Sequence, residues 1–224
     1  MTTTARRLGA RQLIAIDGLD GSGKSEFARA LAAACEAAGA GPVSLFRVDD
    51  FRRALALAPG EDEAAAYYER YYDYAALDAC LAAFEAGATS ARVPRWDPAR
   101  EAVDGERELV FGGATLGLVE GVLVLRSAVA ARAPLVVLEV SEAEARRRIT
   151  ARDAARGRAP DVIHHRIETR YFPAQRRYRA AFDPARRADV LVDNERWAAP
   201  RVVRRDTQHW PSVVESALAA VFPA

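Results

Sequence analysis

The chain has 224 residues, of which 50% are hydrophobic and 28% are charged, a composition typical of a soluble globular domain. Its 32 basic and 31 acidic residues leave a formal net charge of +1, which gives no bulk attraction for nucleic acid or an anionic membrane. We therefore expect a single domain over residues 1–224 with neither a nucleic-acid nor a membrane partner.

The first predicted elements form a βαβ unit. The apolar run "QLIAI" (12–16) ends at Asp17 and a glycine-rich turn, as a buried strand does. From Lys24 apolar residues recur at helical spacing until Gly39, and "VSLFRV" (43–48) predicts a second strand. A strand, a helix and a second strand in this order predict a parallel sheet with a right-handed crossover.

The stretch at about 55–110 differs from its neighbours in composition and predicts an insertion over the substrate side of the sheet. Residues 61–87 are rich in tyrosine and helical in pattern, whereas "ARVPRWDPAR" (91–100) contains prolines and is expected to be extended. In "AVDGERELVF" (102–111) an Asp-Gly pair between two short runs predicts the turn of a hairpin.

Three further apolar runs, at 115–125, 134–140 and 188–194, complete a predicted five-stranded parallel sheet. After the second of them, Ser141 and Glu144 predict a capping box at the start of a helix. On this helix Arg148, Arg152 and Arg156 recur every four residues and share one face.

A second helix is predicted at about 160–181, with Pro173 as a point where it kinks or splits, and a final helix at 211–221. The adjacent His164 and His165 are expected at the surface. Cys35 and Cys80 lie far apart without metal-ligand spacing, which predicts reduced, buried thiols in a cytoplasmic protein. No N-terminal apolar run or membrane-length stretch indicates export or insertion.

One motif carries specific chemistry. Gly18, Gly23, Lys24 and Ser25 satisfy G-x-x-x-x-G-K-[ST], and the motif lies between a predicted strand and a predicted helix. In that position backbone N–H groups and the helix N-terminus surround phosphates, Lys24 reaches the β- and γ-phosphates, and the Ser25 hydroxyl can ligate Mg²⁺.

Lys24 is the only lysine in the chain, since the other 31 of the 32 basic residues are arginines. An ammonium group is a compact point charge on a flexible stem, whereas a guanidinium is a broad planar fork. A chain that otherwise uses arginine therefore indicates that position 24 requires an ammonium group between phosphates.

A phosphate loop indicates a nucleotide but not a reaction, so other residues must discriminate. A signalling GTPase needs the lysine of an N-K-x-D motif, and this chain has no second lysine. Asp49 and Asp50 end the second predicted strand, where a kinase needs a carboxylate to orient an acceptor hydroxyl, although a solvated turn fits as well. Glu120 is placed to hold Mg²⁺, with a structural role as the alternative.

Two further features each have a structural alternative. The arginine-rich helix and the segment after it, at about 142–180, suit a mobile lid that closes over phosphates, or else a solvated helix face. Asp97, between Trp96 and Pro98, suits either the substrate side or a turn.

Taken in order, "IAIDGLDGSGKS", "VDDF", "YDYAAL", "VPRWDPAR", "GLVEGVL", "RRITARDAARGR" and "ADVLVDN" resemble the uridine kinase family of P-loop kinases, and bacterial uridine kinase-like proteins in particular. The resemblance spans about residues 12–194. It implies a P-loop kinase fold with a five-stranded parallel sheet, ATP and Mg²⁺ as phosphoryl donor and cofactor, and a nucleoside 5′-hydroxyl as acceptor.

The resemblance also implies roles for individual residues. Asp49 is expected to be the base, and Lys24, Arg148, Arg156 and Arg158 to contact the transferred phosphates. Ser25, Asp49 and Glu120 are the expected metal ligands. Expected nucleotide contacts are Gly18, Gly21, Ser22, Gly23, Lys24, Ser25, Glu26 and Arg152, and expected acceptor contacts are Asp50, Tyr72, Asp73, Trp96 and Asp97.

Two departures bear on the acceptor and the lid. Family members that take pyrimidine nucleosides have a histidine shortly after the Y-D pair, and here the first histidine is His164, while Trp96 enlarges the aromatic position. The Arg-Asp pair of the lid also stands one place later than in the family, at Arg152.

Two alternatives to a nucleoside kinase stay open. One is a nucleoside monophosphate kinase, although its D-R-Y type motif is missing, and the other is a non-catalytic ATP-binding switch. The sequence does not specify the acceptor, the oligomeric state, or the choice of ATP over GTP.

Overall fold

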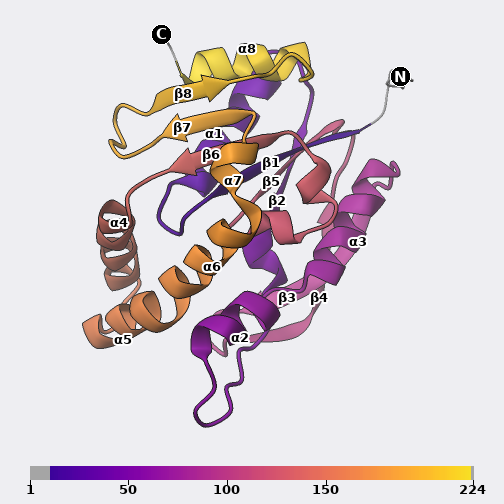
Figure 1. Ribbon diagram of the computed structural model, residues 1–224. Helices are drawn as coiled ribbons and strands as arrows, with labels where there is room; N and C mark the ends of the chain where they lie inside the picture. The colour runs from indigo at the N-terminus through magenta and orange to yellow at the C-terminus, as the bar shows by residue number, and fades with distance from the viewer. Residues whose placement is uncertain (1–10, 223–224) are drawn as a thin grey trace.

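A six-stranded sheet forms the centre of the protein. The computed structural model describes residues 11–222, and Figure 1 shows the sheet between helices. The strand order is β2-β5-β1-β6-β7-β8, in which the first five strands run parallel and β8 is antiparallel to β7. These strands are β1 (Gln12–Gly18), β2 (Val43–Arg47), β5 (Leu116–Glu120), β6 (Leu135–Glu139), β7 (Val190–Asp193) and β8 (Arg201–Arg205). The five predicted parallel strands are confirmed, and β8 was not among the predicted elements.

Helices cover both faces of this sheet because its inner strands are apolar on both sides. In β1, Ile14 and Ile16 pack with α1 and α8, whereas Leu13 and Ala15 join the cluster to which α3 and α6 contribute. A strand buried on both faces has a continuous apolar run rather than an alternating one. The helices are α1 (Lys24–Ala37), α2 (Glu63–Arg70), α3 (Tyr74–Glu85), α4 (Glu142–Ala155), α5 (Pro160–His165), α6 (Phe172–Phe182), α7 (Pro184–Arg187) and α8 (Ser212–Val221).

The sheet order brings distant segments to one edge. Strand β5 lies between β1 and β2, so that Glu120 at its end pairs in register with Ile16 of β1 and Arg47 of β2. Parallel strands present their carboxyl ends at the same edge, where open α/β sheets bind ligands. The loop after β1, the 3₁₀ turn Val48–Phe51 after β2 and Glu120 are therefore neighbours, although they come from three separate parts of the chain.

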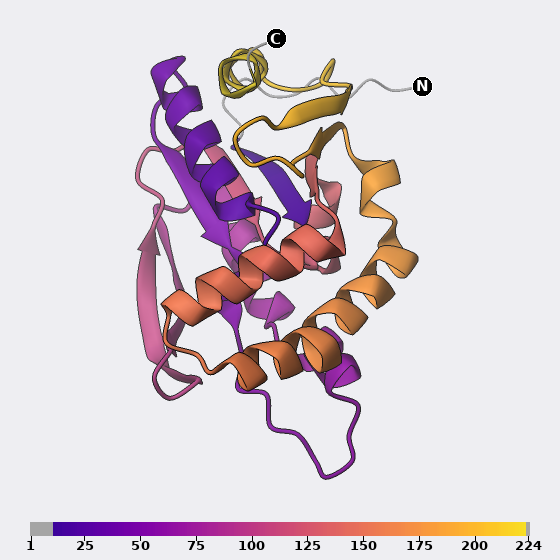
Figure 2. The same ribbon diagram turned by 90° about the vertical axis from the view of Figure 1, so that its left-hand side faces the viewer.

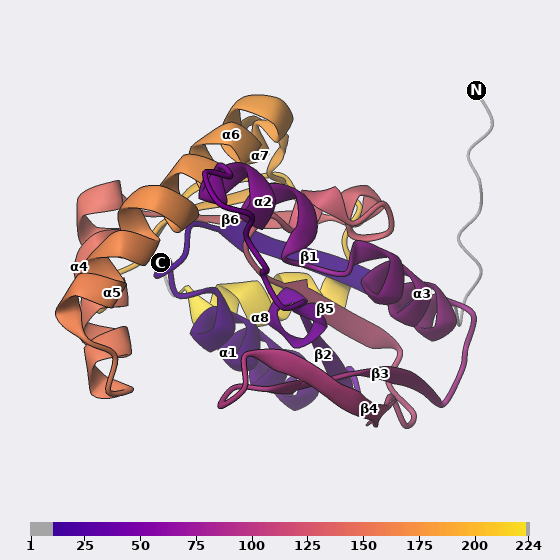
Figure 3. The ribbon, with the colours of Figure 1, turned by 90° about the horizontal axis from the view of Figure 1, so that it is seen from below.

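The predicted insertion contains two helices and a hairpin. The tyrosine-rich stretch is broken between α2 and α3, because Tyr72 forms an isolated bridge with Arg52 and the Asp73 side chain caps α3 at Ala76 N (3.0 Å). Figure 3 shows the hairpin β3 (Ser90–Asp97) and β4 (Ala102–Val110) on the side of the molecule away from α6. The expected single helical stretch is thus two helices.

The predicted Asp-Gly turn of the hairpin is wrong. Asp104 and Gly105 lie within β4 as a bulge opposite Arg95, whose Nε donates to Asp104 O at 2.8 Å. Gly105 has a φ of 79°, which lies in the left-handed region that an Asp-Gly turn also requires. Here the bulge, and not a turn, places the glycine in that conformation. The strands are connected by residues 98–101, where the Asp97 carboxylate accepts from Ala99 N (2.8 Å).

The predicted lid is a helical excursion that leaves the sheet after β6 and returns to it at β7. Figure 2 shows α4, α5 and α6 wrapping around one side of the molecule. A π-helical turn, Arg166–Tyr171, joins α5 to α6 and ends just before Pro173, so the predicted helix is interrupted before this proline by a change of helix type rather than split at it.

Only half of the predicted capping box forms at the start of α4. Ser141 Oγ accepts from Glu144 N at 3.1 Å. Ser141 N donates to Glu195 Oε2 at 2.7 Å rather than to Glu144, because the Glu144 carboxylate is drawn to Arg147 and Arg148. A tertiary contact and two charged neighbours therefore replace the local reciprocal bond.

The C-terminal part closes the sheet edge and the α1 face. Helix α8 confirms the last predicted helix, and Phe222 after it stacks on Phe27 of α1 with 5.5 Å between ring centroids. Cys35 and Cys80 are buried and free of disulfides, as predicted. Between residues 11 and 222, no helix combines the length and the apolar character needed to span a membrane.

Candidate active site

The glycine-rich segment forms a tight loop between β1 and α1. Gly23, the N-cap of α1, has a φ of 93°, and a Cβ at this position would lie 2.5 Å from Trp197 Cζ3. A Cβ on Gly21 would lie 2.8 Å from Ala145 O of α4. Both glycines are therefore required by backbone conformation and by close packing of the loop against the lid and the segment after β7.

Side-chain donors hold the carbonyl groups of this loop. Lys24 Nζ donates to Leu19 O (2.8 Å), Arg148 Nη1 to Gly21 O (3.4 Å), and Asn194 Nδ2 to Ser22 O (2.7 Å). Carbonyl oxygens would repel a phosphate, so tying them to donors favours an orientation in which backbone N–H groups meet the anion.

Ser22 and Lys24 supply a test of whether the loop suits a phosphate group. Ser22 Oγ is fully buried and has no hydrogen-bond partner within residues 11–222, and Lys24 is only 7% exposed. A buried ammonium with one carbonyl partner and an orphaned hydroxyl retain donors that an anion can satisfy. The loop residues therefore fit the triphosphate of a nucleotide.

Ser25 meets Glu120 at the first turn of α1. Ser25 Oγ donates to Glu120 Oε1 at 2.9 Å, and the Glu120 side chain is 5% exposed. Burial raises the pKa of Glu120, with Lys24 acting against this and the charge of Asp49 adding to it. Glu120 is thus close to both Lys24 and Asp49, as the sheet order requires.

A magnesium ion would have few ligands from the protein here. Among residues 11–222 no three Asp, Glu, His or Cys side chains form a metal-binding group. Mg²⁺ in phosphoryl-transfer sites typically uses one or two protein oxygens together with phosphate oxygens and water. The Ser25 hydroxyl and the Glu120 carboxylate fit that pattern, with Asp49 beside them.

Asp49, the expected base, lies in the 3₁₀ turn after β2. Its Oδ1 accepts from the Tyr72 hydroxyl at 3.1 Å and its Oδ2 pairs with Arg52, while 51% of the side chain is exposed. The Tyr72 hydroxyl also contacts the Tyr67 hydroxyl at 3.1 Å. Tyr72 was predicted on the acceptor side, and the structure brings it into direct contact with Asp49.

Arg148 of the predicted lid reaches across the loop to the end of β7. Its Nε donates to Glu144 Oε1 (2.7 Å) and its Nη2 to Asn194 O (2.7 Å). The guanidinium lies 5.4 Å from the centroid of the Trp197 ring. Arg148 therefore joins the lid, the phosphate loop and the segment after β7.

The other lid arginines divide into two groups. Arg152 Nη1 donates to Asp20 Oδ1 in the phosphate loop (2.8 Å), and Arg158 Nη1 donates to Asp153 Oδ2 (2.5 Å). Arg156 follows α4 as its C-cap and is exposed, so the stripe ends at the surface. Arg148 and Arg152 thus lie against the loop, Arg158 is held beside Arg152, and Arg156 is apart from them.

Comparison with known proteins identifies the fold. The structure resembles that of a possible uridine kinase from Bacillus stearothermophilus, at 22% sequence identity and a TM-score of 0.64, over 84% of this chain and 91% of that one. It also resembles a protein from Silicibacter sp. TM1040 provisionally described as a fructose transport system kinase, at 23% identity and a TM-score of 0.62, over 79% and 88% of the two chains. The chain has the P-loop kinase fold. No family model matches the sequence. No curated protein matches it either.

Within this P-loop kinase fold, two predicted acceptor residues are engaged by neighbouring cations. Asp50 pairs with Arg107 of β4 (2.8 Å) and with Arg47 (3.3 Å). Asp73 caps α3 and pairs with Arg53 (2.5 Å). These bonds hold the hairpin and α3 beside the 3₁₀ turn, and acceptor contact by either carboxylate stays a prediction.

The hairpin residues lie farther along the acceptor side of the P-loop kinase fold. Trp96 is half-buried on β3 opposite Val103. Asp97 accepts from Ala99 N and Arg100 N, which is the turn-forming role weighed for it above. Glu26, expected near the nucleotide, is exposed on α1 beside Arg29. Ligand contact by Trp96, Asp97 and Glu26 stays a prediction.

The motifs did not identify Asn194 and Trp197, which border the phosphate loop of this P-loop kinase fold. Asn194 is 7% exposed and donates to Ser22 O, and Trp197 is 52% exposed with its ring against Gly23. The only signal for Asn194 is its place at the end of the run "ADVLVDN", where a parallel strand reaches the ligand edge.

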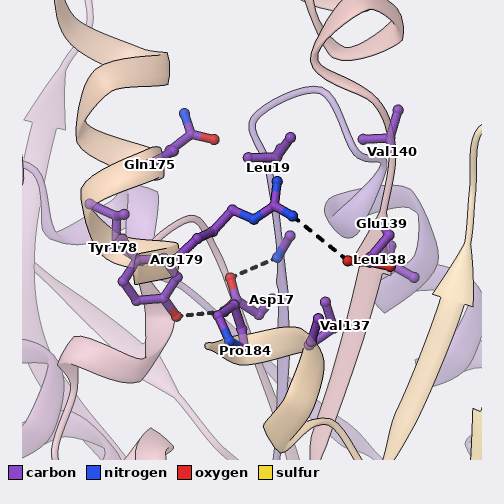
Figure 4. A pocket seen from close by; sticks show the side chains of 13 residues that line it. Asp17, Leu19, Val137, Leu138, Glu139, Val140, Gln175, Tyr178, Arg179 and Pro184 are labelled. Carbon is purple, nitrogen blue, oxygen red and sulfur yellow. Dashed lines mark hydrogen bonds and ion pairs between the residues drawn. The ribbon is translucent and has the colours of Figure 1, made fainter. Parts of the chain in front are cut away.

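Asp17, at the end of β1, is a buried carboxylate of the site that was not predicted. Figure 4 shows it facing Tyr178 of α6, whose hydroxyl donates to Asp17 Oδ2 at 2.5 Å. Burial raises the pKa of Asp17 to about 6, against the hydrogen bonds from Tyr178 and Gly18 and the charge of Lys24. The adjoining cavity, of about 30 Å³, has room for water and not for a nucleotide.

Proposed function

We propose that this protein is an ATP-dependent small-molecule kinase. It transfers the γ-phosphoryl group to a hydroxyl group of a nucleoside or a related ribosyl compound. Bound ATP supplies the phosphoryl group, and Mg²⁺ neutralises charge on its phosphates.

The observation that carries the proposal is the meeting of Ser25, Glu120 and Asp49 at the phosphate loop. Ser25 Oγ donates to Glu120. Burial is the largest cause of the raised Glu120 pKa, and the charge of Asp49 raises it further. A phosphate loop alone binds nucleotide, whereas a metal-holding carboxylate and a second, half-exposed carboxylate beside it suit phosphoryl transfer to an alcohol.

Asp49 orients the acceptor in this proposal. One of its oxygens accepts from Tyr72 and the other pairs with Arg52, which fixes the carboxylate while half of it faces solvent. An acceptor hydroxyl that donates to this exposed part is held for attack, and its proton passes to Asp49 as the phosphoryl group is transferred. Arg148, Arg152 and Lys24 add positive charge on the phosphate side.

The charge pattern of the acceptor side favours an uncharged acceptor over a nucleoside monophosphate. Four of its arginines are already paired with carboxylates: Arg52 with Asp49, Arg107 with Asp50, Arg166 with Glu101 and Arg170 with Glu63. A phosphate carried by the acceptor would have to displace these carboxylates and would be repelled by them. The protein from Silicibacter is described as acting in fructose transport, so free sugars belong among the alcohols to be tested.

The function is tested by measuring ADP release with ATP and Mg²⁺ against a panel of uridine, cytidine, other nucleosides, ribose, fructose and nucleoside monophosphates. We expect turnover with at least one uncharged alcohol and none with the monophosphates. Asp49→Ala is expected to lower kcat by about 10³-fold, within the range for loss of a general base. Asp104→Asn, which changes an exposed carboxylate in the β4 bulge, is the matched control and is expected to keep full activity.

The same experiment addresses the two alternatives. Turnover restricted to nucleoside monophosphates would replace the alcohol kinase with a nucleoside monophosphate kinase. ATP binding without turnover on any acceptor, with Asp49→Ala indistinguishable from the parent protein, would support a non-catalytic ATP-binding module.

A further inference from the structure

The phosphate loop carries an acidic residue, Asp20, at a place where bound phosphates bring negative charge. Its carboxylate makes two bonds with the guanidinium of Arg152 from the lid, Nη1 to Oδ1 at 2.8 Å and Nη2 to Oδ2 at 3.3 Å. Its backbone N–H donates to Gln175 Oε1 of α6 at 2.8 Å. Asp20 is therefore tied to two of the lid helices, α4 and α6, although it belongs to the loop.

Arg152 is held at its two ends by different carboxylates. Its Nε donates at 2.8 Å to Asp153 Oδ1, and the other oxygen of Asp153 accepts from Arg158. Asp153 is fully buried on α4, so the bond to Nε is a fixed anchor within the lid. The terminal nitrogens of Arg152, which pair with Asp20, form the end that can exchange one anion for another.

Asp20 also borders the acceptor side. Burial, followed by the charges of Tyr171 and Asp20, holds the pKa of Tyr67 well above its ordinary value, so Asp20 lies close to that hydroxyl. Tyr67 is hydrogen-bonded to Tyr72, which in turn donates to Asp49. Asp20 is therefore near the tyrosine hydroxyls that contact the expected base, Asp49.

Asp20 stays ionised at neutral pH. Burial alone would raise its pKa, but the charge and hydrogen bonds of Arg152, helped by Lys24, bring the pKa below its ordinary value. A phosphoryl group offers more charge and more acceptor oxygens than a carboxylate, and a guanidinium binds either through the same fork. Phosphates in the loop and Asp20 therefore compete for Arg152.

We propose that Asp20 is a positioning residue that holds the guanidinium of Arg152 at the phosphate loop in the nucleotide-free protein and releases it to the phosphates of bound ATP. This role rests on the proposed function. The pair also links α4 to the phosphate loop before ATP binds. Loss of Asp20 is therefore expected to loosen α4 more in the nucleotide-free protein than in the ATP-bound protein.

The test uses Asp20→Asn, which keeps the shape of the side chain and removes its charge. ATP affinity is measured by calorimetry without an acceptor, lid order by hydrogen exchange of residues 142–155, and turnover by ADP release. We expect ATP to bind about tenfold more tightly, since repulsion and competition for Arg152 are removed, while kcat falls about tenfold. Exchange in α4 is expected to be faster without ATP and to return to the parental rate with ATP.

A double-mutant cycle separates this role from a merely structural one. In an Arg152→Ala background, Asp20→Asn is expected to leave the ATP affinity unchanged, because the competition acts through Arg152. Asp20→Glu, which keeps the carboxylate, is expected to restore the parental exchange rate of α4. If Asp20→Asn fails to fold, Arg152→Lys, which loses the fork but keeps the charge, is expected to loosen α4 in the same way.

Unchanged ATP affinity and unchanged α4 exchange in Asp20→Asn would overturn the proposal, as would an equal affinity change in the Arg152→Ala background. Either result can occur while the parent protein binds ATP and turns over an acceptor, which leaves the kinase assignment intact. Failure of the parent protein to bind ATP would instead refute the proposed function.

Discussion

The hydroxyl of Ser25 and the carboxylate of Glu120 are hydrogen-bonded at 2.9 Å, although 95 positions separate them in the chain. Ser25 is the second residue of α1, immediately after the phosphate-loop lysine, and Glu120 ends the strand that lies beside β1. Their contact links the nucleotide loop to the carboxylates at the edge of the sheet. It is the relationship on which a metal-assisted transfer would depend.

Replacement of Glu120 by glutamine should weaken the dependence on Mg²⁺ without unfolding the protein. Glutamine can still accept from Ser25, but it lacks the charge that a metal ion needs. We expect kcat/KM to fall about 100-fold and half-saturation by Mg²⁺ to need about tenfold more metal. ADP release across a Mg²⁺ titration measures both effects.

Thermal unfolding of the same variant supplies the control. The Glu120 pKa is raised mainly by burial, so its charge opposes folding at neutral pH and Glu120→Gln should keep or raise Tm. Glu106→Gln, at an exposed hairpin position, should match the parent protein in activity and Tm. A Glu120→Gln protein with parental Mg²⁺ dependence would count against a metal role for this carboxylate.

Lys24 should not be replaceable by arginine. Lys24→Ala is expected to lower kcat/KM about 10³-fold with the fold retained, because charge at the phosphates is lost. Lys24→Arg should be nearly as inactive, because a planar fork does not fit the buried space that holds the ammonium near Leu19 O. Circular dichroism and Tm establish the fold, and an active, folded Lys24→Arg protein would contradict the requirement for an ammonium group.

Asp17 should make stability depend on pH between about 4 and 6. Folding raises its pKa to about 6, so the native protein binds more protons than the unfolded chain in this interval. Relative to Asp17→Asn, the parent protein is then most stable below about pH 4 and loses about 3 kcal/mol as pH rises through 6.

Urea unfolding of both proteins from pH 4 to pH 8 measures this difference directly. The Tyr178 hydroxyl has a partner in either protein, because it also accepts from Leu125 N at 3.1 Å. A stability difference that does not change with pH would show that the Asp17 pKa is not raised by folding.

Glu63 should hold the lid against α2. Its carboxylate accepts from Thr169 Oγ1 (2.7 Å), pairs with Arg170, and lies 2.9 Å from His165 Nε2, all three in the lid. The Glu63 side chain is 11% exposed, and its loss leaves the largely buried Arg170 guanidinium without its carboxylate partner, so Glu63→Ala should destabilise by about 3 kcal/mol.

Hydrogen exchange of residues 160–171 should accelerate in Glu63→Ala, and the KM for the acceptor should rise more than kcat falls. Glu69→Ala on the same helix is the matched control, since Glu69 is exposed and forms its ion pair with Arg177, which is also exposed. Equal effects of the two substitutions would show that the lid is not held through Glu63.

Several parts of the fold follow from local patterns. Residues 12–39 form the predicted strand, loop and helix because each depends on neighbours in the chain: apolar residues buried on both faces, glycines with left-handed backbone, and helical spacing after Lys24. The start of α6 next to Pro173 likewise follows from a residue that lacks an N–H and suits the first turn of a helix.

Other local signals were overruled by tertiary contacts. Asp104 and Gly105 are residue types that favour a turn, but the whole segment pairs with β3, and the two residues form a bulge within β4. The Ser141–Glu144 box is half formed because Glu195, from beyond β7, takes the Ser141 N–H. The edge strand β8 has three arginines in five residues, and it becomes a strand only because β7 offers an unpaired edge.

The sequence by itself determined the phosphate loop, the parallel sheet and the identity of Lys24, Asp49 and Glu120 as candidates, because motifs, periodicity and strand ends are read from neighbouring residues. The tertiary structure decided which residues meet: the Asn194 side chain with the Ser22 carbonyl, Arg152 with Asp20, and Tyr178 with Asp17. Each of these pairs spans more than 100 positions, and only the order of strands in the sheet and the packing of α4 and α6 against the loop bring such residues together.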